Sequence, residues 1–152
     1  MATTLSDMVD LFMTKVNDYR LTAIYSTSGS TALSTYAEPW LMAAIVEFDM
    51  CVPPLAYTES TSTDEGYFST DLSLENKMIL AEIMVKYWLQ KSVQDILQMN
   101  NLVTDHDFRM FSRAQNLDSK RQYYNAKCEE ISQMLIRYEY KYNDWTAWKN
   151  TL

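Results

Sequence analysis

Glycine, proline, cysteine and histidine are all scarce in this chain of 152 residues, with two, three, two and one of each. Two glycines nearly exclude a phosphate-binding loop, which needs several of them. Cys51 and Cys128 form no Cys-X-X-Cys motif, so we expect a reducing, cytosolic environment. No apolar run approaches the roughly eighteen residues of a membrane span, and the N-terminus lacks the pattern of a secretory signal. We therefore expect neither membrane insertion nor classical secretion.

His106 is the only histidine, which limits the chemistry available to the side chains. A Ser–His–Asp or Cys–His pair would have to use it, yet no strand–turn nucleophile motif is present. A helical di-iron site needs two histidines, and the spacing of His106, Cys51 and Cys128 gives no support for a zinc site. We interpret His106 as a polar residue in the first turn of a helix, and expect no catalytic residue, metal or cofactor.

Glu82 and Glu47 are the best candidates for a catalytic carboxylate, because both lie within apolar runs. A general acid needs such surroundings to raise its pKa. The simpler interpretation is that each lies on a helix surface or in an ion pair. Lys86 and Lys91 are spaced for ordinary pairs with Glu82 and Asp95 along one helix.

Basic residues are absent between Arg20 and Lys77, and this stretch carries eight acidic residues, more negative charge than the net −7 of the whole chain. Phosphate contacts need clustered Lys and Arg, so we expect no sequence-specific nucleic-acid binding. A solvated acidic loop is the simpler interpretation, and docking on a basic protein surface is the alternative.

Hydrophobic spacing predicts an all-α fold, with one helical domain over residues 1–142 and a C-terminal tail at 143–152. We expect a bundle of four to five helices with long loops or a small hairpin at 50–72. A capping box at Thr4 and Asp7 starts a first helix over about 5–20. Pro39 suits the first turn of a short helix that ends near residue 49.

Two long helical patterns occupy residues 72–142, which contain neither Gly nor Pro. Asp71 or Ser73 caps the first, which runs to about residue 99; its wide apolar face predicts a central position. The second begins near residue 105, and Asn116–Ser119 either breaks it or lies within it. Apolar residues then follow a spacing of four and three to the C-terminus: Tyr124, Cys128, Ile131, Leu135, Tyr138, Tyr142 and Trp145.

Two segments show no helical pattern. Residues 21–37 include a polar run around Gly29 and are predicted to be a loop or extended segment, with a short strand near Leu21 as the alternative. Residues 55–71 are predicted to form a loop, a hairpin or an arm that contacts another protein, since long loops in compact domains commonly carry function.

Large contact residues are abundant, with ten Met, eleven Tyr, five Phe and four Trp. Most of them fit the core patterns. Five lie outside the best of those patterns, or in the tail where the last pattern ends, and are our candidates for protein contacts, because aromatic residues dominate interface energies: Tyr57, Tyr67, Phe68, Trp145 and Trp148.

The run Leu72–Glu75 leads into Leu80–Leu89, and Thr104–Leu117 leads into a long helix that ends in Tyr138–Tyr140. These stretches resemble the head–tail connector, or adaptor, proteins in the neck of tailed bacteriophages. The resemblance covers about residues 72–142 and, more loosely, the first helix and the Ala43–Phe48 helix.

The resemblance implies a structural virion protein without catalytic activity. Its copies would form a homo-oligomeric ring, expected to be twelve-fold, that binds the portal protein and other neck or tail proteins and through which DNA can pass. It would lie in the neck of the virion, and in the host cytoplasm during assembly. The 21–37 segment, the 50–72 loop and the tail would supply the contacts.

Two hypotheses of other classes remain. A small cytosolic helical protein that binds and regulates a host protein ranks second. A hydrolase that uses Glu82 or Glu47 ranks third.

Overall fold

A computed structural model describes residues 2–102 and 108–142, with side chains described outside 96–116. Helices dominate this part of the chain, in the order α1 (Leu5–Lys15), α2 (Tyr19–Glu47), α3 (Leu74–Leu102) and α4 (Phe108–Tyr142). Two short strands, β1 (Tyr57–Thr58) and β2 (Tyr67–Phe68), stand between α2 and α3. The prediction of an all-α fold is confirmed.

The capping box predicted for α1 is present: Thr4 Oγ1 accepts from the Asp7 N–H at 3.2 Å, and Asp7 Oδ2 accepts from the Thr4 N–H at 3.0 Å. The helix ends earlier than predicted, because Val16 is extended and its side chain is buried. Asp18 then caps the next helix by accepting from the Arg20 N–H at 2.8 Å. A break at 16–18 therefore separates α1 from α2.

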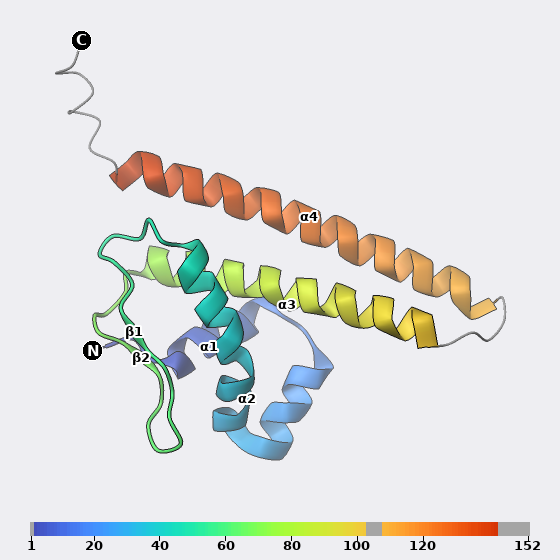
Figure 1. Ribbon diagram of the computed structural model, residues 1–152, viewed down its shortest axis with the longest axis horizontal. Coiled ribbons are helices and arrows are strands. Elements are labelled where there is room, and N and C mark those ends of the chain that lie inside the picture. The colour runs from blue at the N-terminus through green and yellow to red at the C-terminus, as the bar shows by residue number, and fades with distance from the viewer. Residues whose placement is uncertain (1, 103–107, 143–152) are drawn as a thin grey trace, which may run out of the picture.

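The prediction of a loop or strand at 21–37 is wrong, because α2 runs through this segment. Gly29, at φ +84°, bends α2 into two helical parts, which meet at a corner in Figure 1. Only glycine adopts this backbone region without strain. The second part buries one face at helical spacing: Leu33, Ala37, Trp40, Leu41 and Ala44. Pro39 lies inside the helix and not in its first turn, so that prediction is also wrong.

Helix α3 is central, as its wide apolar face predicts. It contacts α1, α2 and α4, and seven apolar side chains in the part of α3 with described side chains are buried: Ile79, Leu80, Ala81, Ile83, Met84, Val85 and Leu89. Ser73 caps it, since Ser73 Oγ accepts from the Asn76 N–H at 3.2 Å.

Helix α4 is continuous through residues 116–119 and lies along α3 (Figure 1). Ile131 and Tyr138 are buried against the core, and Tyr124, Met134 and Leu135 pack beside them. All of these residues except Met134 belong to the predicted pattern of four–three spacing. That pattern therefore marks the face of α4 that lies toward α3. Most other described side chains of α4 are exposed.

The 55–71 segment contains a hairpin. Strands β1 and β2 pair antiparallel, with Tyr57 opposite Phe68 and Thr58 opposite Tyr67. Thr4 forms a further bridge with Tyr67, so the N-terminal segment extends the sheet. The hairpin lies beside the start of α1 (Figure 1).

Candidate protein-interaction surface

Glu38 of α2 holds the hairpin in place. Its Oε1 accepts from the Tyr57 hydroxyl and the Ser60 N–H, both at 2.8 Å, and its Oε2 accepts from Ser60 Oγ. Burial by itself would raise the pKa of Glu38, but the hydrogen bonds from Ser60 and Tyr57 outweigh it and lower the pKa. The carboxylate is therefore ionised near neutral pH, and it fixes the hairpin to α2.

A second set of hydrogen bonds joins the hairpin to the start of α1. Glu65 Oε1 accepts from the Ser6 N–H, and the Gly66 carbonyl accepts from the Leu5 N–H at 2.8 Å. A carboxylate at a helix N-terminus is favoured by the helix dipole. Gly66 also packs tightly, because a Cβ there would lie 2.1 Å from the Tyr57 hydroxyl oxygen. The hairpin is thus attached to both helices and is not a free arm.

The attached hairpin leaves its tip, residues 59–65, on the surface. Glu59 and Asp64 are exposed there. The turn is closed by the Thr61 N–H, which donates to the Asp64 carbonyl at 2.8 Å, and by Thr61 Oγ1, which accepts from the Asp64 N–H at 3.0 Å. The tip therefore presents Glu59 and Asp64 on an ordered turn, while the third exposed carboxylate, Glu65, is bonded to the Ser6 N–H.

The predicted contact residues have different positions. Tyr67 is 45% exposed and available for contacts, whereas Tyr57 is partly buried against Glu38 and the ring of Phe68. Phe68 is fully buried, so its assignment to a contact surface is corrected: it is a core residue. Trp145 and Trp148 lie outside the described residues, as does His106.

Sequence patterns missed a group of exposed aromatic residues on α2. Tyr19 is 77% exposed, and Tyr25 and Tyr36 are also exposed. Tyr25 and Tyr36 lie in the 21–37 segment that was predicted to be a loop, and Tyr19 lies in the part of the predicted first helix that belongs to α2 in the structure. Helix α4 adds three large exposed side chains away from its buried seam: Tyr123, Ile136 and Tyr140.

A cleft of about 270 Å³ opens where the start of α2 meets α3 and α4. Trp88, Ser92 and Asp95 of α3 line it, together with Lys120 of α4 and residues 17–20. Trp88 is half-buried, so the cleft offers an aromatic wall beside polar and charged groups.

Glu82, a candidate carboxylate, lies in an ion-pair network between three helices. Lys15 of α1 and Lys127 of α4 approach its two oxygens at 2.7 and 3.0 Å. Burial alone would raise the pKa of Glu82, but the hydrogen bonds from these lysines outweigh it and lower the pKa. This direction is opposite to that of a general acid, which needs a raised pKa.

Glu47, the other candidate, pairs with Lys86 of α3. The predicted pairs along α3 are therefore replaced by pairs between helices, and Lys91 donates to the Tyr36 hydroxyl at 3.0 Å. Burial, with Glu47 nearby, raises the pKa of Tyr87 to about 12. These contacts support an ion-pair role for Glu47.

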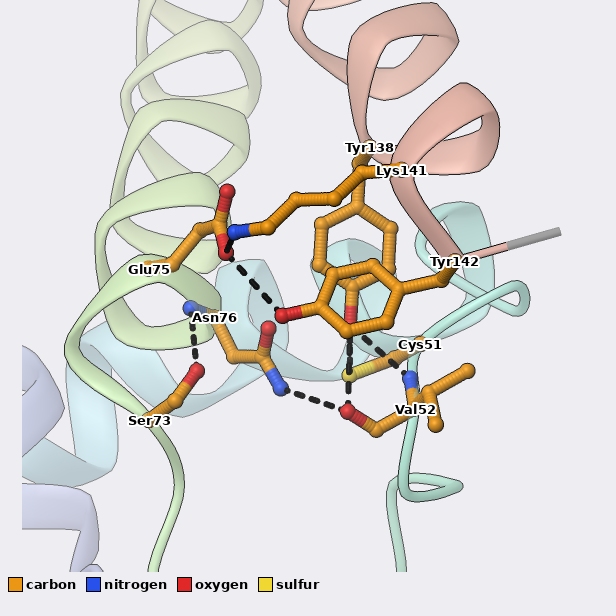
Figure 2. Close-up of polar contacts among 8 residues, drawn as sticks. All are labelled: Cys51, Val52, Ser73, Glu75, Asn76, Tyr138, Lys141 and Tyr142. Carbon is orange, nitrogen blue, oxygen red and sulfur yellow. Dashed lines mark hydrogen bonds and ion pairs between the residues drawn. The ribbon is translucent and has the colours of Figure 1, made fainter.

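A polar cluster fixes the end of α4 to the segment after α2 (Figure 2). The Tyr138 hydroxyl accepts from the Val52 N–H at 2.9 Å and donates to the Val52 carbonyl at 3.1 Å. Asn76 Nδ2 donates to the same carbonyl at 3.3 Å. Burial raises the pKa of Cys51, next to Tyr138, so this thiol is a poor nucleophile. The cluster is structural.

Lys141 and Tyr142 continue this attachment at the surface. Both contact Glu75 Oε2 of α3, at 2.6 and 3.2 Å (Figure 2). The described part of α4 is thus held to α3 up to its last residue.

Within residues 2–102 and 108–142, no group of three or more His, Cys, Asp or Glu side chains could hold a metal ion. Of the helices in these ranges, none has the length and apolar character that a membrane crossing requires. No protein-family description, curated protein or solved structure matches the chain.

Proposed function

We propose that this chain is a structural subunit of the neck of a tailed bacteriophage, with copies that form a ring between the portal and the next tail component. The proposal starts from the resemblance of residues 72–142 to head–tail connector proteins. The observation that supports it most is the presence of separate sets of exposed apolar side chains on α2 and α4.

A ring needs two different contact surfaces on each subunit, because each copy meets one neighbour through each of them. The first part of α2 offers Tyr19 and Tyr25, and α4 offers Tyr123, Ile136 and Tyr140. Aromatic side chains of this kind supply much of the energy of protein contacts. With 35 residues, α4 is about 52 Å long at 1.5 Å per residue. A helix of this length gives a ring subunit an extended edge.

The proposal is tested by quantitative mass spectrometry of gradient-purified phage particles whose genome encodes this chain. Matched rings of portal and connector require a molar ratio of this chain to the portal subunit of about one. Absence from the particles, despite expression during infection, would refute the neck role. That result would favour a helical protein that binds and regulates a host protein.

A further inference from the structure

The cleft at the start of α2 contains two cations without an ion pair. Five lysines with described side chains are paired with carboxylates in this chain: Lys15, Lys77, Lys86, Lys127 and Lys141. Arg20 and Lys120, in the cleft wall, form no ion pair among the residues described. Arg20 Nε instead donates to the Tyr19 hydroxyl at 3.5 Å, which holds the guanidinium beside the cleft.

Two carboxylates, Asp18 and Asp95, also line the cleft. Asp18 is occupied as the cap of α2, since it accepts from the Arg20 N–H at 2.8 Å. Asp95 lines the cleft from α3, and the charges of Asp18 and Asp95 both act on Arg20, with Asp18 the larger of the two. Lys91 borders the adjoining hollow, next to Asp95, Asp18 and Arg20. The three cations outnumber the two carboxylates, so the region favours an acidic ligand.

Within the part of the chain that the structure describes, the hairpin tip carries unpaired negative charge, whereas the cleft carries unpaired positive charge. Glu59 and Asp64 are exposed and form no ion pair with any described residue, and Arg20 and Lys77 are the nearest basic residues along the chain. Asp64 Oδ2 accepts only from the Thr63 hydroxyl, at 3.0 Å. Because the hairpin is attached through Glu38 and Glu65, its tip is ordered before any partner binds, which lowers the entropic cost of association.

We infer that the hairpin tip of one copy binds in the cleft of a second copy, with Glu59 and Asp64 facing Arg20 and Lys120. This inference deepens the proposed function and rests on it. The partners are complementary in charge, and carboxylate–guanidinium pairs are among the strongest charge-assisted hydrogen bonds. The cleft volume of about 270 Å³ admits the end of a turn, and Trp88 and Tyr19 provide apolar surface beside the charges.

The tip and the cleft are formed by different parts of one chain. Figure 1 shows the hairpin beside the start of α1, and the start of α2 on the other side of α1. No residue of the tip lines the cleft. A pair of copies joined by one such contact is head-to-tail and leaves one free tip and one free cleft. Repetition of such a contact gives a ring when the rotation closes.

Charge reversal tests the contact in the full chain of 152 residues. One variant carries Glu59→Lys and Asp64→Lys in the tip, and another carries Arg20→Glu and Lys120→Glu in the cleft. A control with Asp10→Lys and Glu129→Lys changes the charge as much as the tip variant does, at exposed positions elsewhere. Sedimentation velocity at low ionic strength, where screening is weakest, measures association, and circular dichroism verifies folding.

We expect the wild type and the control to self-associate, and the tip and cleft variants each to associate at least about tenfold more weakly, a change of about 1.4 kcal/mol. Mixing the two variants should restore association, because a lysine tip then meets a glutamate cleft. Unchanged association in either folded variant, or failure of the mixture to recover, would overturn the inference.

A wild type that stays monomeric at every concentration would also overturn it. The particle measurement then decides the proposed function separately. If the isolated chain is monomeric but is present in particles at a molar ratio of about one to the portal subunit, the proposed neck role stands and only the tip–cleft contact is refuted. If the chain associates in a charge-dependent way but is absent from particles, the tip–cleft contact stands and the neck role is refuted.

Discussion

Replacing Glu82 with glutamine should lower the free energy of unfolding by about 2–3 kcal/mol. Breaking a buried ion pair by removing one partner typically costs about 3–5 kcal/mol. The expected loss is smaller because the Glu82 side chain is 13% exposed and Lys127 retains a second partner, Glu130, at 2.7 Å. Glutamine keeps the shape of the side chain, so the change measures charge and not packing.

Glu130→Gln is the matched control, since it removes the other carboxylate that pairs with Lys127. Glu130 is 54% exposed, and exposed pairs are worth only about 0–1 kcal/mol. Urea unfolding at neutral pH, followed by circular dichroism, gives both values. For a domain of this size the loss at Glu82 corresponds to a fall in Tm of about 4–12 °C. A Glu82→Gln variant no less stable than Glu130→Gln would refute the reasoning.

The same network makes stability depend on pH. The folded state lowers the pKa of Glu82 below the unfolded value of about 4.3. The unfolded chain therefore binds more protons in this range, and stability rises with pH. The contribution of Glu82 is complete above the unfolded pKa and disappears as the pH falls through the folded pKa. Wild type and Glu82→Gln should thus differ most near neutral pH and converge in acid; a constant difference would contradict the assignment.

Two further substitutions test the attachments of α4 and of the hairpin. Tyr138→Phe removes a buried hydroxyl that bonds twice to Val52, so urea unfolding should show a loss of about 1–2 kcal/mol. Tyr25→Phe, at a position 55% exposed, should change stability by less than about 0.5 kcal/mol, and equal effects would contradict the structural role of Tyr138. Gly66→Ala places a Cβ 2.1 Å from the Tyr57 hydroxyl oxygen, so the Tyr57 side chain must move from its place between Glu38 and the hairpin, at a cost of about 1–3 kcal/mol. Limited proteolysis should then cleave residues 57–68 faster than in the wild type, and unchanged cleavage with unchanged Tm would refute the tight packing.

Strong local patterns predicted much of the fold. The capping box at Thr4 and Asp7 located the start of α1, and the wide apolar face located α3 at the centre. The four–three spacing identified the face of α4 that Ile131 and Tyr138 bury. Such signals are local, because a helix repeats its contacts every three to four residues.

The candidate surface was less predictable. Phe68 and Tyr67 are adjacent aromatics on one strand, yet one is buried and the other exposed, because successive side chains point to opposite faces. Which face is covered depends on how the hairpin packs. The exposed Tyr25 and Tyr36 of α2 were not predicted, because 21–37 was interpreted as a loop.

The sequence by itself determined the helical class, the positions of α1, α3 and α4, and the acidic character of the stretch between Arg20 and Lys77. Only the tertiary structure decided that 21–37 is helical, that Lys86 pairs with Glu47, and that the hairpin is attached to two helices. The polar run around Gly29 has weak helical preference, and burial of the second part of α2 against α3 overrides it. Contacts between residues far apart in the chain carry no periodic signal, so packing alone selects them.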